Sequence, residues 1–270
     1  MAHAQNRYIA DLRDFQFLLF EQFNLPEILQ HSRFEGMDAD AARMVLGEIY
    51  SFAKEVLGPL DGVGDSEGCR VENGAVRTPT GFKDAWNKLY QAGWKTLRVD
   101  PQYGGQGAPA LLTAACEEML SGANTAFNMY PGLAMGAAEV IHSFGTQTQK
   151  DLYLRRMFNG QWGGTMCLTE PHAGSDVGSA RTRATALPDG RYLISGTKIF
   201  ITAGEHDLAE NIIHLVLARI EGAPAGTKGL SLFIVPKVRV DEQGALLRPN
   251  DVTLGGIEHK MGINGSATCV

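Results

Sequence analysis

The pattern of apolar residues changes near Gly160, from the spacing of helices to the alternation of strands. Before that residue, apolar side chains recur at helical spacing. After it, alternating apolar and polar residues are separated by turns that contain Gly and Asp. A helical half followed by a strand-rich half favours an α+β fold. We therefore expect an N-terminal extension at 1–37, an all-helical N-terminal domain at 38–160, and a β-barrel-like middle domain at 161–270.

The helical half divides at capping residues, glycines and prolines. We expect helices at 8–23, 39–57, 109–121 and 132–144, with another after Thr80. Asp38 is the expected cap of the second helix, which Gly58-Pro59 should end. The stretch after it should be a loop with a hairpin tip at Asn73-Gly74. Thr148 and Asp151 predict a capping box for one more helix, which ends at Phe158.

Strands are expected at 165–168, 180–186, 192–202, 212–220 and 230–240. Asp189-Gly190 is the expected hairpin turn between the second and third of these strands.

Charge and composition exclude several classes of protein. The chain has 270 residues, 44% of them apolar, and a net charge of −6, which argues against nucleic-acid binding through a basic face. The four cysteines form no C-x-x-C pair, and no metal-ligand spacing is present, so we expect reduced thiols and a cytoplasmic protein. The uncharged stretch 120–138 contains Gly, Asn and Pro, which indicates a buried helix rather than a membrane span.

The stretch 166–176 combines an apolar strand end with a polar, turn-forming loop. Thr169 supplies a hydroxyl group, and Pro171 fixes its own backbone angle. Residues 173–176 are small, so their amides and the Ser175 hydroxyl can approach an anion such as a phosphate. By itself the stretch is also compatible with an ordinary surface turn.

A second stretch, 196–203, reads Gly-Thr-Lys-Ile-Phe-Ile-Thr-Ala and lies about thirty residues further on. Together the two stretches resemble the flavin-binding signature of the acyl-CoA dehydrogenase family. Further segments that resemble the family occur in the family's order along the chain, at 103–107, 149–154, 228–230 and 260–266. The stretches 64–69 and 77–82 resemble the longer subgroup of the family, which includes 3-methylthiopropanoyl-CoA dehydrogenases.

The resemblance implies a fold and a reaction. The fold is a helical domain followed by a β-barrel-like domain, with the family's C-terminal helical bundle absent from this chain. The reaction is FAD-dependent α,β-dehydrogenation of an acyl-CoA: a carboxylate removes the α-proton, and a hydride from the β-carbon passes to the flavin. The family's Glu base lies on the C-terminal bundle, so we expect no catalytic residue in this chain and no turnover by it alone. The resemblance also implies an electron-transfer flavoprotein as electron acceptor, and a homodimer or homotetramer.

The resemblance also assigns residues to the cofactor. The residues expected to bind FAD are Met166, Leu168, Thr169, Gly174, Ser175, Phe200 and Thr202. Thr169 would donate to the pyrimidine end of the flavin, and Thr202 would reach its N5 atom. Phe200 stands where most relatives carry Trp, so it keeps a ring but lacks the indole N–H.

Substrate contacts are expected at Ser175, which would also touch the CoA part, and along the acyl pocket at Met129 and Tyr130. For Met129 and Tyr130, a place in the hydrophobic core is an equally good interpretation. Two other functions remain open: an acyl-CoA oxidase of the same fold, and a non-catalytic scaffold or DNA-associated relative. The acidic charge disfavours the DNA-associated reading.

Overall fold

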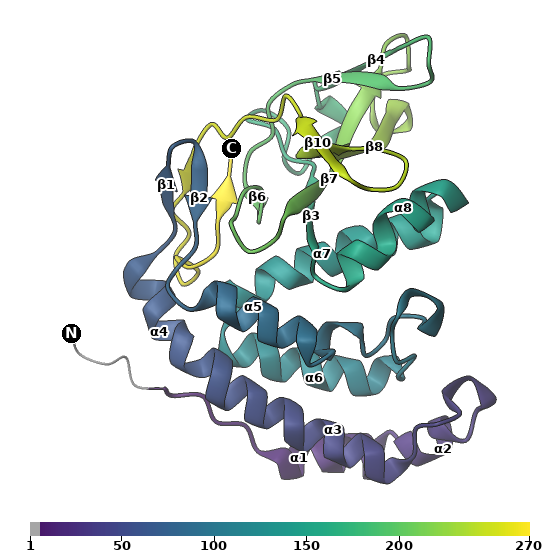
Figure 1. The fold of residues 1–270 in the computed structure, drawn as a ribbon, viewed down its shortest axis with the longest axis vertical. Coiled ribbons are helices and arrows are strands. Elements are labelled where there is room, and N and C mark those ends of the chain that lie inside the picture. Colours follow the sequence, from purple (N-terminus) through teal and green to yellow (C-terminus); the bar gives the residue numbers. More distant parts are fainter. Residues whose placement is uncertain (1–5) are drawn as a thin grey trace.

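Helices and sheets occupy opposite ends of the molecule. The computed structural model describes residues 6–270. Helices α1 to α6 form a stack, α7 and α8 lie above it, and the five-stranded sheet lies beyond α7 and α8, while the β1–β2 hairpin extends from α4 at one side (Figure 1). The expected α+β class and the order of helical and strand-rich parts are confirmed. The exact domain boundaries stay a prediction.

The first helices include two π-helical turns. Helix α1 (Leu12–Gln16) starts later than expected, because the Asp11 side chain accepts from the Arg13 amide at 2.9 Å, and the chain continues as a π-helix to Gln22. After α2 (Leu25–Leu29), helix α3 (Ala39–Phe52) begins where the sequence predicted. The Asp38 carboxylate accepts from the Ala41 amide at 2.8 Å.

The prediction that Gly58-Pro59 ends this helix was wrong. A π-helix (Ala53–Leu57) leads directly into α4 (Gly58–Glu67). Pro59 stands in the first turn of α4, and the helix continues through it; the Lys54 carbonyl accepts from the Asn6 side chain in place of an N–H at position 59. The hairpin of β1 (Arg70–Glu72) and β2 (Ala75–Arg77) follows, with Asn73 and Gly74 both at positive φ, as the sequence predicted.

The remaining helices are α5 (Phe82–Gln91), α6 (Ala110–Ala123), α7 (Thr125–Phe144) and α8 (Gln147–Phe158). Helix α7 begins earlier than residue 132, because the Asn124 side chain caps the Phe127 amide at 2.9 Å and the helix accommodates Pro131 in its interior. The capping box of α8 is formed by Thr146 and Gln149, so the prediction of Thr148 and Asp151 was wrong.

Five strands form the main sheet, in the order β3-β7-β4-β5, with β8 paired to β7. Their bounds are β3 Trp162–Cys167, β4 Arg183–Ala186, β5 Tyr192–Ser195, β7 Asn211–Ile220 and β8 Leu230–Pro236. Strand β7 is parallel to β3 and β4 and antiparallel to β8. The turn at Asp189-Gly190 joins β4 to β5, as predicted.

Two smaller sheets complete the strand-rich part. One contains β11 (Ile257–Glu258), β12 (Thr268–Cys269) and β6 (Ile201–Thr202), and the other contains β9 (Val238–Val240) and β10 (Leu246–Pro249). The strand expected at 230–240 is therefore interrupted at Lys237, between β8 and β9.

The strand expected at 192–202 is also interrupted. Residues 196–200 leave the sheet between β5 and β6, and Phe200 has a φ of +56°. A Cβ atom on Gly196 would lie 2.3 Å from the Thr182 hydroxyl oxygen, so only glycine allows the chain to pass so close to β4. This departure from regular strand geometry brings residues 196–200 to the loop that follows β3.

Helix α7 packs directly on β3 and joins the two halves. A Cβ atom on Gly164 would lie within 3.2 Å of Met157, Ala137 and Ala134, so glycine is required for this close approach. Buried side chains from α7, α8, β3 and β7 form one hydrophobic cluster at this contact. Among the described helices, none is long and apolar enough to cross a membrane.

Candidate functional site

The two stretches that the sequence singled out are in contact. The loop after β3 and the segment before β6 are joined by the Ile199 amide, which donates to the Thr169 carbonyl at 2.9 Å. Lys198 Nζ donates to the Leu168 carbonyl, also at 2.9 Å. Residues separated by about thirty positions in sequence therefore form one surface.

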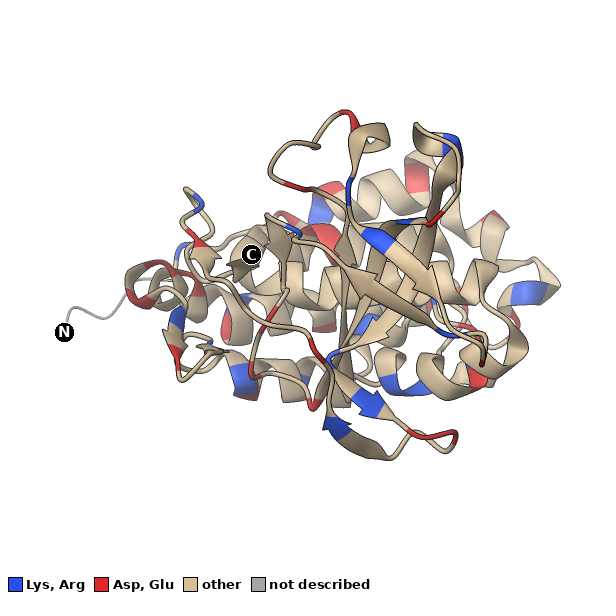
Figure 2. Ribbon diagram, turned by 90° about the horizontal axis from the view of Figure 1, so that it is seen from above, with Lys and Arg blue, Asp and Glu red and all other residues tan. Residues whose placement is uncertain are grey.

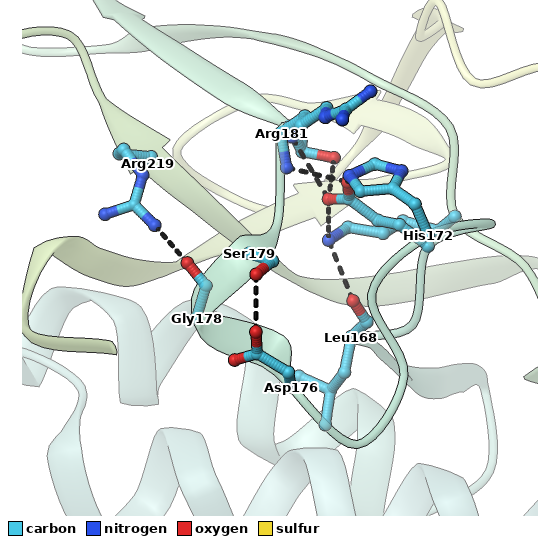
Figure 3. A network of polar contacts seen from close by, with 10 residues as sticks. Leu168, His172, Asp176, Gly178, Ser179, Arg181 and Arg219 are labelled. Carbon is cyan, nitrogen blue, oxygen red and sulfur yellow. Dashed lines mark hydrogen bonds and ion pairs between the residues drawn. The ribbon is translucent and has the colours of Figure 1, made fainter. Parts of the chain in front are cut away.

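Glu170 is the centre of this contact, and only 3% of its surface is exposed. Its Oε1 accepts from Lys198 Nζ at 2.8 Å, from the Thr182 hydroxyl at 2.6 Å and from the Thr182 amide at 3.1 Å. Its Oε2 accepts from the Arg181 amide at 2.7 Å. His172 Nε2 lies 3.5 Å from Glu170 Oε2, and Figure 3 shows His172 and Arg181 close together in this network of polar contacts.

These contacts keep Glu170 ionised. Burial by itself would raise its pKa, but hydrogen bonds from Lys198, Thr182 and the Arg181 amide lower the pKa to about 2. A carboxylate with so low a pKa and so many donors is a poor proton acceptor. Glu170 therefore holds the loop in place. Sequence reasoning missed this role, because the donors come from positions 11 to 28 residues away, outside any local motif.

The part of the loop with small side chains lies at Gly174 and Ser175. Among residues 6–270, the backbone amides of these two residues donate no hydrogen bond. The loop around them is fixed by two hydrogen bonds between Glu170 and Ala173, and by a 2.5 Å bond from Ser179 to Asp176 (Figure 3). Exposed amides on a fixed turn suit an anion such as a phosphate.

Phe200 has an unusual backbone conformation. Its φ of +56° lies in the left-handed region, which is costly for an aromatic residue and occurs mostly at functional sites. The side chain is 48% exposed, and Lys260 Nζ lies 5.2 Å from the centre of its ring. The structure therefore presents an aromatic ring beside the loop at the cost of backbone strain.

The other predicted cofactor contacts surround the same junction. Met166 and Leu168, at and after the end of β3, are partly exposed. Thr169 and Thr202 are also partly exposed, and within the described part of the chain their hydroxyl groups have no hydrogen-bond partner. The junction thus offers apolar surface, an aromatic ring, unpaired hydroxyls and free amides. This set fits a ligand with a flat heterocycle and a phosphate.

Tyr130 and Met129 lie on α7. Tyr130 is 1% exposed, and its hydroxyl donates to the Gly265 carbonyl at 3.0 Å and accepts from the Ala267 amide at 2.7 Å. Its ring therefore fixes α7 to the segment that precedes β12. Met129 is partly exposed. The prediction that both residues line an acyl pocket stays a prediction.

Two buried histidines lie beneath the site, and sequence reasoning assigned them no role. His214 Nδ1 lies 2.8 Å from the Thr165 hydroxyl on β3, and His206 packs against Trp86 and Tyr130. Burial lowers the pKa of His206 to about 3 and that of His214 to about 4, so both rings are neutral at pH 7. Among residues 6–270, no group of three or more His, Cys, Asp or Glu could hold a metal ion.

Comparison with known proteins covers both halves of the chain. Residues 40–161 match the family model described as acyl-CoA dehydrogenase, N-terminal domain, and residues 165–270 match the model of the middle domain. The chain is 43% identical to 3-methylmercaptopropionyl-CoA dehydrogenase of Ruegeria pomeroyi, over 97% of this chain and 45% of that protein. It is 42% identical to the broad-specificity linear acyl-CoA dehydrogenase FadE5 of Mycobacterium tuberculosis, over 98% and 44%.

Solved structures show the same fold. The acyl-CoA dehydrogenase of Bacillus anthracis, complexed with FAD, aligns with a TM-score of 0.66 and 26% identity, over 87% of this chain and 35% of that chain. The chain spans about half the length of the curated relatives it matches. Two family models in tandem, similar relatives and a shared fold agree, and the chain belongs to the acyl-CoA dehydrogenase family.

Proposed function

We propose that the protein catalyses FAD-dependent α,β-dehydrogenation of an acyl-CoA thioester to the 2-enoyl-CoA, and that this chain provides a large part of the FAD site. The observation that carries the proposal is the junction of the loop after β3 with the segment before β6. It leaves unpaired hydroxyls, free amides and an exposed aromatic ring at one place. The same residues carry the family's flavin-binding signature, and the relative of known structure named above is complexed with FAD.

Each residue at the junction has a proposed task. The Thr169 and Thr202 hydroxyls bind the polar edge of the flavin ring, and the side chains of Met166, Leu168 and Phe200 cover its apolar surface. The free amides of Gly174 and Ser175 bind the pyrophosphate. When bound, FAD would supply the acceptor for the hydride of the substrate's β-carbon. The Thr169 and Thr202 hydroxyls would stabilise negative charge on the ring.

The proton acceptor is proposed to lie outside this chain. Glu170 is an acidic residue of this loop. Because its pKa is low and its carboxylate already accepts four hydrogen bonds, it is poorly suited to remove a proton from the substrate. We infer from the family resemblance that the base is a Glu of a C-terminal helical bundle. We therefore expect the 270-residue chain alone not to turn over.

The proposed substrate is a short or sulfur-containing acyl-CoA, such as 3-methylmercaptopropionyl-CoA, because the relative named for that activity is 43% identical. Met129, partly exposed on α7, is the proposed wall of the acyl pocket. An electron-transfer flavoprotein is the proposed electron acceptor, and a homodimer or homotetramer the proposed assembly of the whole protein.

The test is a titration of the purified chain with FAD, followed by quenching of flavin fluorescence. Thr169→Val and Thr202→Val should each raise the Kd for FAD about tenfold, because each removes one donor to the ring. Thr185→Val, in strand β4, is the matched control and should leave the Kd unchanged. Failure of the chain to bind FAD, or equal Kd values for all three variants, would contradict the proposal. Bleaching of the FAD-loaded chain by an acyl-CoA would contradict the proposed absence of a base.

A further inference from the structure

Lys260 lies over the exposed ring of Phe200. Its Nζ is 5.2 Å from the centre of the ring, within the separation of about 6 Å that a cation–π contact requires. In the described part of the chain, Lys260 forms no ion pair within 4.0 Å of a carboxylate. Figure 2 shows basic and acidic residues interspersed over the molecule in that view, so a lysine at the surface is normally free in solvent. The ring of Phe200 is the contact that orders this one.

The two residues are sixty positions apart in the sequence and meet through the small sheet β11-β12-β6. Phe200 directly precedes β6, and Lys260 follows β11 by two residues. Strand β12 pairs with both strands, because Thr268 is in register with Thr202 on one side and with Glu258 on the other. Strand pairing therefore brings the lysine to the segment that forms half of the proposed flavin site.

The turn that carries Lys260 is fixed to the helical half of the molecule. The Ile263 amide donates to the Lys260 carbonyl at 3.1 Å. Asn264 then accepts from the Cys69 amide at 3.1 Å through its carbonyl, and its side chain donates to Asp65 Oδ1 on α4 at 3.0 Å. The ammonium group therefore extends from a fixed backbone, and holding it over the ring costs little further entropy.

The ring of Phe200 is less restrained than its backbone. The backbone is held on both sides, by the hydrogen bond from the Ile199 amide to the loop after β3 and by the pairing of Ile201 in β6. The side chain is 48% exposed. A half-exposed ring that has to be ordered when a ligand binds lowers the affinity, and a contact that orders it beforehand raises the affinity.

We propose that Lys260 is a positioning residue of the proposed flavin site, which holds the Phe200 ring in the orientation that meets the flavin. This inference rests on the proposed function for the identity of the cofactor. The ammonium group covers one face of the ring, so the ring offers its remaining surface to the ligand. Lys260 acts through Phe200 and not through a contact of its own with the cofactor.

The test is a fluorescence titration of the chain with FAD. Lys260→Met keeps the length of the side chain and removes its charge, and it should raise the Kd for FAD about threefold through loss of an exposed cation–π contact. Lys260→Arg should restore the original Kd, because a guanidinium also binds an aromatic face. Lys54→Met is the matched control and should leave the Kd unchanged, since Lys54 lies 5.8 Å from the centre of the Tyr50 ring in the helical half.

A second pair of variants separates the positioning role from a direct one. In the Phe200→Leu chain, Lys260→Met should not change the Kd for FAD any further, because no ring remains for the lysine to hold. A further loss of affinity in that chain would overturn the inference, because Lys260 would then act on FAD directly. An unchanged Kd in Lys260→Met alone, or no recovery in Lys260→Arg, would overturn it as well.

The contact is also measured without FAD. In NMR spectra of the free chain, the ring current of Phe200 should move the signals of the Lys260 ε-methylene protons upfield, and Phe200→Leu should abolish this displacement. A chain that shows the displacement but does not bind FAD would count against the proposed function, whereas the lysine would still be shown to hold the ring. A chain that binds FAD without the displacement would overturn this inference and leave the proposed function intact.

Discussion

Replacing Lys198 with methionine keeps the length of the side chain and removes the ammonium group that joins the two segments. Lys198 Nζ donates to Glu170 Oε1 at 2.8 Å and to the Leu168 carbonyl at 2.9 Å, and the Lys198 side chain is only 9% exposed. The substitution leaves a buried carboxylate without its cation, which typically costs about 3–5 kcal/mol. Three other hydrogen bonds still hold Glu170, so we expect a loss of about 3 kcal/mol in the free energy of unfolding at pH 7.

The lowered pKa of Glu170 makes this loss depend on pH. It lies at about 2 in the folded chain against an ordinary value of 4.5, a difference of about 3 kcal/mol to which Lys198 contributes together with the Thr182 side chain and the Arg181 and Thr182 amides. Because the folded pKa is the lower one, this stabilisation is complete above pH 4.5 and is lost as the pH falls toward 2. At pH 3.5 the difference between the original chain and Lys198→Met should therefore be about 1 kcal/mol smaller than at pH 7.

The assay is urea-induced unfolding at pH 7, 5 and 3.5, followed by tryptophan fluorescence. Lys88→Met is the matched control, because Lys88 pairs with Asp84 at 2.7 Å on an exposed helix surface. That variant should lose less than about 0.5 kcal/mol. A loss for Lys198→Met no larger than the loss for Lys88→Met would show that the buried ion pair does not stabilise the fold. A loss that is the same at all three pH values would show that it does not act through the Glu170 carboxylate.

Three further predictions follow from buried or strained groups. Tyr130→Phe should lower the free energy of unfolding by about 1–3 kcal/mol, since it leaves the buried Ala267 amide unpaired, and faster hydrogen exchange of that amide checks the cause. Phe200→Gly should raise the free energy of unfolding by about 1 kcal/mol, because glycine adopts the left-handed conformation without strain. It should also weaken FAD binding, which fluorescence titration measures. A variant that unfolds more easily than the original would contradict this. Burial lowers the pKa of His206 to about 3 and that of His214 to about 4. Below pH 6.5 the unfolded chain binds protons at these histidines and the folded chain does not, so the free energy of unfolding should fall with the pH. His214→Asn should flatten this dependence in unfolding measured from pH 7 to 4.5, whereas an unchanged slope would exclude the ring as its source.

Short-range chemistry made several elements predictable from the sequence. Asp38 is predictable as a helix cap, because an aspartate side chain can accept from the amides of the first helical turn. Asn73-Gly74 is predictable as a hairpin turn, because both residues adopt positive φ readily. The helix boundaries were predicted wrongly where contacts with distant parts of the chain determine whether a proline ends a helix. Pro59 reads as a helix breaker unless the chain places it in a first turn, and Pro131 is tolerated inside α7.

The candidate site shows the same division. The sequence pointed to the two segments, and the structure brings them into contact, because Gly196 lets the chain pass close to Thr182. The role of Glu170 could not be predicted. An acid in a polar loop is normally solvated, and the amides that bind it belong to residues 181 and 182, on the far side of a turn. The contact of Lys260 with Phe200 likewise depends on strand pairing, which no local pattern specifies.

On the proposal above, one FAD molecule contacts both segments of the junction. The most direct measurement is a titration of the isotope-labelled chain with FAD, followed by backbone amide chemical shifts in NMR spectra. We expect the largest shifts at Gly174 and Ser175 in the loop and at Phe200 and Thr202 in the second segment, and all four should saturate together with one Kd. Binding of FAD that shifts only one of the two segments, or neither, would contradict it.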